Sequence, residues 1–341
     1  MNNILEIQKK VIPEMIELLD KRYNILRSIY FCQPVGRRTL ANNLDMGERI
    51  VRTETTTLKE NGLIDIASAG MTITDEGLFV LDALHDLMHE FRGLLEMEKL
   101  VANLLNIKRV ILVPGNYDND IYILKDLGKV ASEFLKDNIF EHCNIGVTGG
   151  TTMFEIINEA KKAQINKEFL VVPARGGVGA NLEIQANHIA AMLAQKLNGD
   201  YKLLQVPDNM SREAFDSLLT LPEIKELVDI ISNLDILMFG IGRADKMAKR
   251  RKIATEQFEL LKKGNAVAEA FGYYFDIDAN IVSESNTIGL DLEQFKNIKL
   301  AIGVACGAEK AEAIKAISAL KEDLILIMDE GAARALLDKR F

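Results

Sequence analysis

The sequence predicts an α/β protein in which a small N-terminal winged helix-turn-helix precedes a larger domain with a Rossmann-like parallel sheet. Two observations support this prediction. A helix-turn-helix-hairpin pattern lies between residues 40 and 76, and apolar strand-like runs alternate with helical ones from residue 109 onward. With 341 residues, 48% of them hydrophobic, the chain is long enough to bury two cores. We expect one domain at residues 1–76, a helical connection at 77–106 and a second domain at 107–341.

The composition argues against several classes of protein. Its three cysteines, Cys32, Cys143 and Cys306, are far apart and form no CxxC pair, which argues against a disulfide framework or a thiolate zinc site. No apolar run reaches the roughly 18 residues of a membrane span, and the N-terminus lacks the basic and apolar regions of a signal peptide. We therefore expect a soluble, cytoplasmic protein with no membrane partner, no metal ion and no cofactor.

The segment LANNLDMGERIVRTETTTLKENGLI, which begins at Leu40, predicts a short helix, a tight turn and a second helix that ends before Gly62. At about 100° per residue, the second helix places Val51, Thr55 and Leu58 on one face. The opposite face carries Arg49, Arg52, Thr53 and Thr56. Arginine can donate two hydrogen bonds to a guanine edge, and threonine can contact a base or a thymine methyl group, so this face is suited to a DNA major groove.

The charge around this helix pair supports a nucleic-acid interface, although the whole chain has a net charge of -9. Residues 21–62 contain eight basic and four acidic side chains. Phosphate contacts are expected from Arg37, Arg38 and Lys59. The following LIDIASAGMTITDEG predicts two short strands joined around Ala69-Gly70, which form a wing. The alternative is a helical protein-interaction domain with an ordinary solvated face.

A long helical stretch follows from Thr74, with apolar residues spaced by three and four positions. They are Leu81, Leu84, Met88, Phe91 and Leu95. This heptad spacing could pair two copies of the chain, or the helix could pack on its own domain. His85 and His89 are four residues apart but lack the glutamate of an HExxH motif, so a solvated pair is the better interpretation.

The second domain is predicted from seven apolar runs separated by helical segments. The runs are RVILVP, NIGVT, FLVVPA, YKLLQVP, ILMFGIG, KLAIGVA and LILIMDE. Alternating strands and helices indicate a parallel sheet with helices on both faces. Such sheets bind ligands where the carboxyl ends of strands meet helix N-termini.

The clearest of these junctions is the segment 144–152, where a buried strand meets two glycines and two threonines before a helix. Backbone N–H groups and hydroxyls there could hold a phosphate, although the segment matches neither GxxxxGK[ST] nor GxGxxG. A tight turn with capping threonines is the alternative. Three further junctions combine glycine with basic side chains, at 173–177, 240–250 and 306–310. If these cations converge, they suit a ligand with two phosphates.

Several segments together resemble the SorC-type transcriptional repressors that control glycolytic operons. The segments are IQKKVIPEMIELLDKRYNILRSI, PVGRRTLANNLDMGERIVRTE, GMTITDEG, GVTGGTT and ARGG, and the similarity spans nearly the whole chain. The N-terminal segments are the specific ones, because the last two indicate only the broader family. The resemblance implies a repressor that binds operator DNA, forms a homo-oligomer that is a tetramer built from dimers, and responds to fructose-1,6-bisphosphate.

The sensor domain of this family is similar to sugar-phosphate isomerases of the glucosamine-6-phosphate deaminase type. The resemblance implies phosphate-binding roles for Gly149, Gly150, Thr151, Thr152, Arg175, Arg250 and Lys310. It implies sugar-hydroxyl contacts for Gln185 and Glu269.

The same similarity supplies the alternative function, an active sugar-phosphate isomerase or deaminase. Those enzymes carry an Asp-Gly-His segment after the GxG of the corresponding strand. Here Gly240-Ile-Gly242 is followed by Arg243-Ala244-Asp245, without a histidine. His142 and His188 are each isolated in the sequence of this domain. We therefore expect no catalytic residues and no enzymatic activity.

Overall fold

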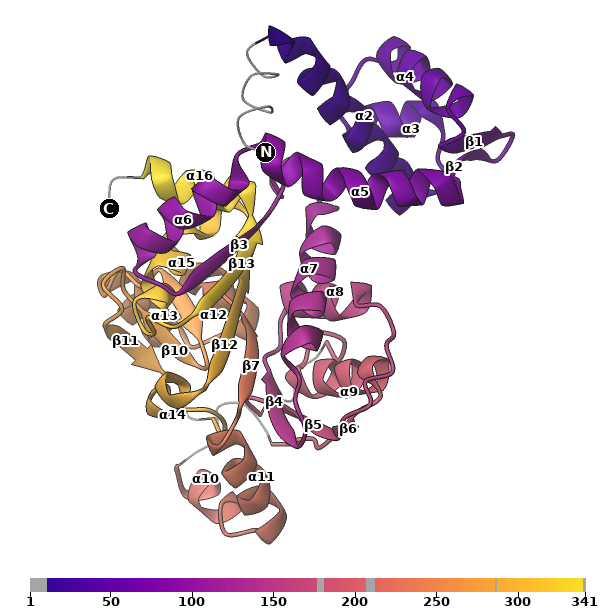
Figure 1. The fold of residues 1–341 in the computed structure, drawn as a ribbon. Coiled ribbons are helices and arrows are strands. Elements are labelled where there is room, and N and C mark those ends of the chain that lie inside the picture. The colour runs from indigo at the N-terminus through magenta and orange to yellow at the C-terminus, as the bar shows by residue number, and fades with distance from the viewer. Residues whose placement is uncertain (1–10, 177–180, 207–211, 286, 340–341) are drawn as a thin grey trace. The chain divides into compact units, whose positions relative to one another are not determined.

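The computed structural model describes residues 11–176, 181–206, 212–285 and 287–339 (Figure 1). The chain forms two compact units, residues 1–96 and 97–341. The helical connection expected at 77–106 is therefore shared between the units. We describe each unit by itself.

The first unit is a winged helix-turn-helix, as the sequence predicts. Its elements are α2 (Pro13–Cys32), α3 (Arg37–Asn43), α4 (Glu48–Glu60), β1 (Ile64–Ala67), β2 (Gly70–Ile73) and α5 (Asp75–Phe91). The two strands pair antiparallel, with Ile64 opposite Ile73. Ile25, Leu40, Val51 and Met71 come from different elements and are buried in one apolar core. That shared core fixes α4 against the other helices and leaves its polar face outward.

Helix α5 packs on its own unit. Leu81 and Met88 are buried in the core of the first unit, and Leu84 packs against it. The helical stretch is interrupted at Gly93, whose φ of +67° is incompatible with a continuous α-helix, and α6 (Leu94–Leu105) follows. Leu95, the last residue of the heptad run, is exposed. The apolar spacing thus serves the core of the unit, and pairing of this helix with a second copy stays a prediction.

The second unit is built on a seven-stranded sheet in the order β3-β13-β12-β7-β4-β5-β6. The strands are β3 (Arg109–Val113), β4 (Cys143–Val147), β5 (Phe169–Pro173), β6 (Asp200–Tyr201), β7 (Ile236–Gly240), β12 (Leu300–Ala305) and β13 (Ile325–Asp329). Every neighbouring pair is parallel. Six of the seven apolar runs form a strand, which confirms the predicted parallel-sheet fold. The run YKLLQVP supplies only Tyr201 to the two-residue β6, and residues 202–206 form no strand.

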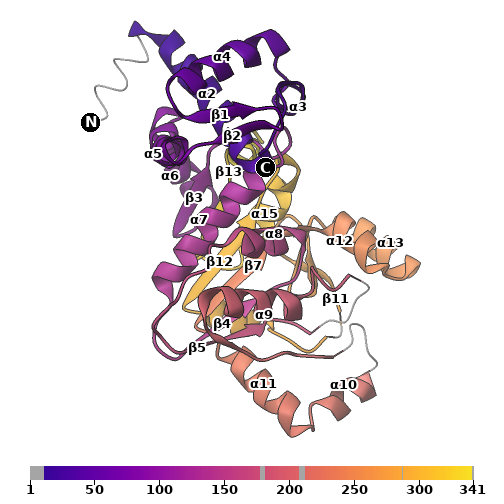
Figure 2. The ribbon, with the colours of Figure 1, turned by 90° about the vertical axis from the view of Figure 1, so that its right-hand side faces the viewer.

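Helices cover both faces of this sheet, as Figures 1 and 2 show. On one face lie α7 (Ile123–Asn138), α8 (Thr151–Glu159) and α9 (Ala186–Leu197), whose apolar side chains form one core with the strands. On the other lie α15 (Ala311–Ser318) and α16 (Glu330–Asp338). The remaining helices are α10 (Arg212–Leu218), α11 (Pro222–Ser232), α12 (Ala244–Arg251), α13 (Thr255–Lys263), α14 (Leu292–Asn297) and the 3-10 turn η1 (Ala308–Lys310).

A second, smaller sheet was not predicted from the sequence. Its antiparallel strands are β8 (Gly242–Arg243), β9 (Ala268–Ala270), β10 (Tyr273–Phe275) and β11 (Ile281–Glu284), in the order β11-β10-β9-β8. Helices α12 and α13 pack on it through Ala248, Leu261 and Tyr274. Strands of two to four residues are too short for a periodic pattern, so the sequence gives no signal for this sheet.

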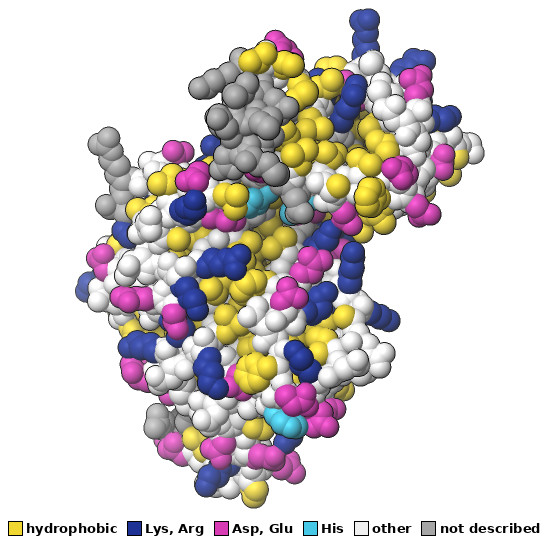
Figure 3. Space-filling model, viewed as in Figure 1, with side chains coloured by type: hydrophobic (Ala, Val, Ile, Leu, Met, Phe, Trp, Pro, Cys, Tyr) yellow, Lys and Arg dark blue, Asp and Glu magenta, His cyan; other side chains and the backbone are white. Residues whose placement is uncertain are grey.

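The surface carries mixed charge on the face drawn in Figure 3, where basic and acidic side chains alternate over the second unit. A phosphate backbone is attracted to a continuous basic surface, which this face of the unit does not display among the described residues. Within the described ranges, no helix is both long and apolar enough to cross a membrane.

Gly77 lies in the first turn of α5, close to Leu63 just before β1, and it supplies a test of the first unit's packing. A Cβ added there would lie 2.0 Å from the carbonyl oxygen of Leu63. Gly77→Ala should therefore lower the free energy of unfolding by about 1–3 kcal/mol, as overpacking does elsewhere. Urea unfolding followed by circular dichroism measures this loss.

Gly36→Ala is the matched control, because a Cβ at Gly36 meets nothing within 4 Å. Its effect should stay below about 1 kcal/mol, the usual range for changes at a helix N-cap. Equal stability of the Gly77→Ala variant and the wild type would contradict the close approach of α5.

Candidate functional site

A cavity of about 630 Å³ lies at the carboxyl edge of the parallel sheet; we call it the sheet-edge pocket. The ends of four neighbouring strands supply part of its lining, with Thr148 after β4, Arg175 after β5, Gly240 at the end of β7 and Lys310 after β12. The structure brings together all nine residues for which the sequence implied a ligand role. They are Gly149, Gly150, Thr151, Thr152, Arg175, Gln185, Arg250, Glu269 and Lys310.

The turn after β4 is shaped by two glycines for different reasons. Gly150 has φ +128°, a backbone conformation that other residues rarely adopt, and its N–H donates to Ile184 O. A Cβ at Gly149 would lie 2.7 Å from the same carbonyl oxygen. Helix α8 starts at Thr151, and the first N–H groups of a helix have no intrahelical acceptor. This turn therefore presents N–H groups, hydroxyls and a positive helix end to an anion.

One buried carboxylate organises the arginines at another side of the pocket. Glu269 Oε1 lies 2.7 Å from Arg251 Nη2 and 3.6 Å from Arg175 Nη1, and it accepts the N–H of Gly272 at 3.1 Å. The Glu269 side chain is only 5% exposed. Its position makes it a counter-ion that holds two guanidinium groups toward the cavity. The sugar-hydroxyl contact implied for Glu269 stays a prediction.

The turn that carries Lys310 is fixed by hydrogen bonds to the Asp329 carboxylate. The two oxygens of this fully buried carboxylate accept the N–H groups of Tyr117 and Gly307, each at 2.9 Å, and burial raises the pKa of Asp329. The Lys310 ammonium makes no hydrogen bond or ion pair with any residue that the structure describes, although the main-chain N–H donates to Gly307 O, and burial lowers the pKa of Lys310. A bound anion would offset that desolvation, which makes Lys310 a strong candidate for a phosphate contact.

The remaining predicted residues occupy helix ends, and four further cations line the pocket. Gln185 is the N-cap residue of α9, and Arg250 lies in the last turn of α12. The further cations are Arg243, Lys246, Arg251 and Lys252; the sequence singled out the junction 240–250 but gave none of the four a ligand role. The signal that was overlooked is the four-residue spacing of Lys246 and Arg250, which places them on one face of α12.

The polar face of α4 is exposed as the sequence predicts. Arg49, Arg52, Thr53 and Thr56 are exposed, whereas Val51, Thr55 and Leu58 are buried. The hydroxyls of Thr53 and Thr56 donate to the helix carbonyls of Arg49 and Arg52.

The flanking residues hold or extend this face. An ion pair of 2.8 Å between Glu54 and Arg22 ties α4 to α2. Arg38 and Lys59 are exposed, while Arg37 is half-buried. The DNA contacts of all these residues stay predictions.

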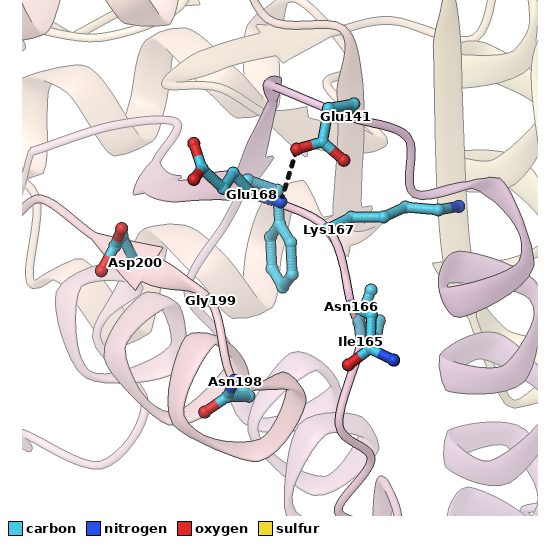
Figure 4. Close-up of a pocket in the computed structure, with 9 residues that line it drawn as sticks. Glu141, Ile165, Asn166, Lys167, Glu168, Asn198, Gly199 and Asp200 are labelled. Carbon is cyan, nitrogen blue, oxygen red and sulfur yellow. Dashed lines mark hydrogen bonds between the residues drawn. The ribbon is translucent and has the colours of Figure 1, made fainter.

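A second cavity lies beside the start of β5 and shares no lining residue with the sheet-edge pocket (Figure 4). The atoms of Glu141, His142 and Glu168 that could bind a metal ion lie within 4.8 Å of one another there. Glu141 accepts the N–H of Glu168, and Lys167 points away to donate to Ile139 O. All three side chains of the group are exposed, and ordinary surface contacts account for them.

Comparisons with known proteins match both units. A family described as "Putative sugar-binding domain" matches residues 89–338, and one described as "CggR N-terminal DNA binding domain" matches residues 18–88. Proteins named central glycolytic genes regulator are 40% identical in Priestia megaterium and 39% identical in Bacillus subtilis, each over 99% of both chains.

Solved structures agree with these matches. A putative SorC family transcriptional regulator from Enterococcus faecalis is 37% identical, with a TM-score of 0.68 over 71% of this chain and 100% of its own. The full-length sorbitol operon regulator SorC from Klebsiella pneumoniae is 16% identical and has a TM-score of 0.68 over 95% of this chain and 99% of its own, which shows the shared fold.

The three thiols should differ in reactivity because thiol reagents attack the thiolate. Burial raises the pKa of Cys306 to about 12 and also raises the pKa of Cys143, so both stay protonated at pH 8. Cys32 is only half-buried. We expect one fast-reacting thiol in the native chain and three after denaturation, measured with a chromogenic disulfide reagent. Cys32→Ser should remove the fast phase; a fast phase that persists would contradict this assignment.

Proposed function

Because this chain belongs to the SorC family of transcriptional regulators, and within it to the central glycolytic genes regulators, we propose that it represses a glycolytic operon and that fructose-1,6-bisphosphate relieves the repression. The relatives are regulators with DNA-binding and sugar-binding domains. This confirms the prediction that the chain is not an enzyme, and the isomerase or deaminase alternative is set aside. As a reader of chromosomal DNA, the protein would work in the cytoplasm.

The observation that carries the effector proposal is the convergence of nine expected residues on one cavity. They come from turns and helix ends that are far apart in the chain, and they include three cations, Arg175, Arg250 and Lys310. A cavity of about 630 Å³ is within the usual range for small-molecule sites, roughly 300–1,000 Å³. Several cations around one cavity favour a ligand with more than one phosphate.

We assign one phosphate of the effector to the α8 N-terminus, with Gly149, Gly150, Thr151, Thr152 and Lys310. The second phosphate would lie against Arg175 and Arg250. Gln185 and Glu269 would then contact the sugar hydroxyls. The helix dipole and the desolvated ammonium support the first assignment, because both favour negative charge at the same point.

We assign operator recognition to the exposed face of α4. Arg49, Arg52, Thr53 and Thr56 would enter the major groove, while Arg37, Arg38 and Lys59 would contact phosphates. Two copies of the chain would present two such helices to the two half-sites of an operator. We further propose that the homo-oligomer is a tetramer built from dimers, as the family resemblance implies.

Effector and operator must influence each other if this function is correct. An inducer shifts the protein only through its different affinity for the two states, and the coupling is reciprocal. Isothermal titration should therefore show weaker binding of fructose-1,6-bisphosphate in the presence of operator DNA. The factor should equal the factor by which the sugar weakens DNA binding, typically about 5–150-fold. Equal sugar affinity with and without operator would refute the inducer model.

Thr152→Val is the matched variant for this titration, because it removes only a hydroxyl from the α8 N-terminus. It should abolish the sugar response and leave operator affinity nearly unchanged. Thr220→Val is the control, since the Thr220 hydroxyl donates to Ser217 O on an exposed turn outside the pocket.

Substitutions on α4 should separate base contacts from phosphate contacts. Arg52→Ala should weaken operator binding by about 1–3 kcal/mol and reduce the preference over scrambled DNA, because it removes a base contact. Lys59→Ala should weaken both DNAs alike and lower the salt dependence by about one ion. Fluorescence anisotropy over a salt series measures both effects. Equal losses on operator and scrambled DNA for Arg52→Ala would reject a base contact.

A further inference from the structure

We propose that Glu309 is an internal counter-anion of the sheet-edge pocket, which neutralises Arg243 and Lys246 in the absence of ligand and is replaced by a phosphate group of the ligand. The proposal rests on the proposed function, because it concerns the same effector. It adds Arg243 and Lys246 to the residues that bind the effector. It also gives Glu309, which is not in the pocket lining, a role in setting the affinity.

The contacts of Glu309 place a carboxylate against two cations of the pocket. Glu309 Oε2 lies 3.1 Å from Arg243 Nη1, and Oε1 contacts Lys246 Nζ. Arg243 and Lys246 both line the cavity. The Lys246 ammonium lowers the pKa of Glu309, so the carboxylate is ionised at neutral pH. Two pocket cations are therefore paired with the same carboxylate.

The contacts of Arg243 would let Nη1 change partner while Nε and Nη2 stay bound. Its Nε and Nη2 donate to the two oxygens of Asp245, at 3.0 and 2.9 Å. Only Nη1 is directed to Glu309. If Glu309 leaves, Asp245 still holds the guanidinium in place, and Nη1 becomes available to a phosphate oxygen.

The row of cations on α12 explains why a phosphate would reach this pair. Lys246 and Arg250 are four residues apart and lie on one face of α12, and Arg243 is the N-cap residue directly before that helix. Arg250 is already a predicted phosphate contact at one end of the row. Lys310, the residue after Glu309, is another. The Glu309 carboxylate thus contacts Lys246, which shares a helix face with one expected phosphate contact, and it directly precedes another in the chain.

Exposure to solvent distinguishes Glu309 from Glu269, the acidic side chain that lines the pocket. Glu309 is 41% exposed, with Arg243 at 30% and Lys246 at 58%, whereas Glu269 is 5% exposed. Ion pairs that water reaches are weak and exchange readily, but a buried pair is costly to break. A phosphate carries more charge than a carboxylate and has three acceptor oxygens. The ligand should therefore displace Glu309 and leave Glu269 in place.

The turn around Glu309 does not depend on its side chain. The N–H of Gly307 is held by Asp329, and the N–H of Ala308 is held by Asp118 at 3.0 Å. Glu309→Gln should consequently fold normally and keep Lys310 in position. This makes the variant a test of the carboxylate charge.

The experiment measures ligand affinity of full-length wild type and variants by isothermal titration with two probes, fructose-1,6-bisphosphate and inorganic pyrophosphate. Glu309→Gln should bind the bisphosphate about three- to tenfold more tightly, because the competing charge is gone. Glu293→Gln is the matched control: this exposed carboxylate pairs with Lys296 on α14, outside the pocket, and its loss should change affinity less than twofold. Unchanged or weaker binding by Glu309→Gln would overturn the proposal.

A double-mutant cycle separates competition from a structural role. Lys246→Gln should weaken binding, and Glu309→Gln should gain less affinity in that background than in the wild type. A carboxylate that merely positions Lys310 would instead lower affinity in both backgrounds. Equal gains in both backgrounds would also overturn the exchange at Lys246.

The two probes distinguish failure of this inference from failure of the proposed function. If the wild type binds pyrophosphate but no sugar phosphate, the proposed effector is wrong, and the pyrophosphate series still decides the role of Glu309. If the sugar binds every variant equally well, Glu309 has no such role and the proposed function stands. If the wild type binds neither probe, both proposals are wrong.

Discussion

The common direction of the seven strands is the constraint on which the pocket depends. Because every neighbouring pair in the large sheet is parallel, all carboxyl ends reach the same edge. The glycine turn after β4, Arg175 after β5 and the Lys310 turn after β12 therefore meet, although the chain separates them widely. A single buried carboxylate, Asp329, then joins two of the loops at this edge by accepting their N–H groups. The second unit thus concentrates cations without needing a basic surface elsewhere.

Two carboxylates handle these cations in different ways. Glu269 is buried and holds Arg175 and Arg251 in place, whereas Glu309 is water-accessible and lies against cations at the margin. A site for a highly charged ligand must keep its cations from repelling one another when empty. A fixed counter-ion such as Glu269 neutralises the arginines and also orients them. A counter-ion that the ligand can replace, as we propose for Glu309, neutralises its cations without blocking the ligand.

The sequence predicted features that depend on local pattern and on the direction of parallel strands. Six of the seven strand runs, the helix-turn-helix with its wing, and the pocket residues from Gly149 to Thr152 follow from apolar spacing, glycine and strand-end position. The antiparallel sheet did not follow, because its strands are too short for a pattern. The ion pair of Glu269 with Arg251 was also missed, since it forms only when β9 folds beside the end of α12. The sequence could not show where Leu81 and Met88 pack, because their spacing suits contact with a partner helix as well as the core of the same unit, where the structure places them.

The glycine turn also divides the pocket into a part that evolution can hardly alter and a part that it can tune. Position 150 excludes side chains through its backbone angle, and position 149 excludes them through the carbonyl of Ile184. Related proteins with this fold would have to keep the glycine turn after β4 nearly unchanged. Diversification toward other sugars would fall instead on the arginine- and lysine-bearing elements around it. The fold thus separates recognition of a charged group that many metabolites share from recognition of what distinguishes one metabolite from another.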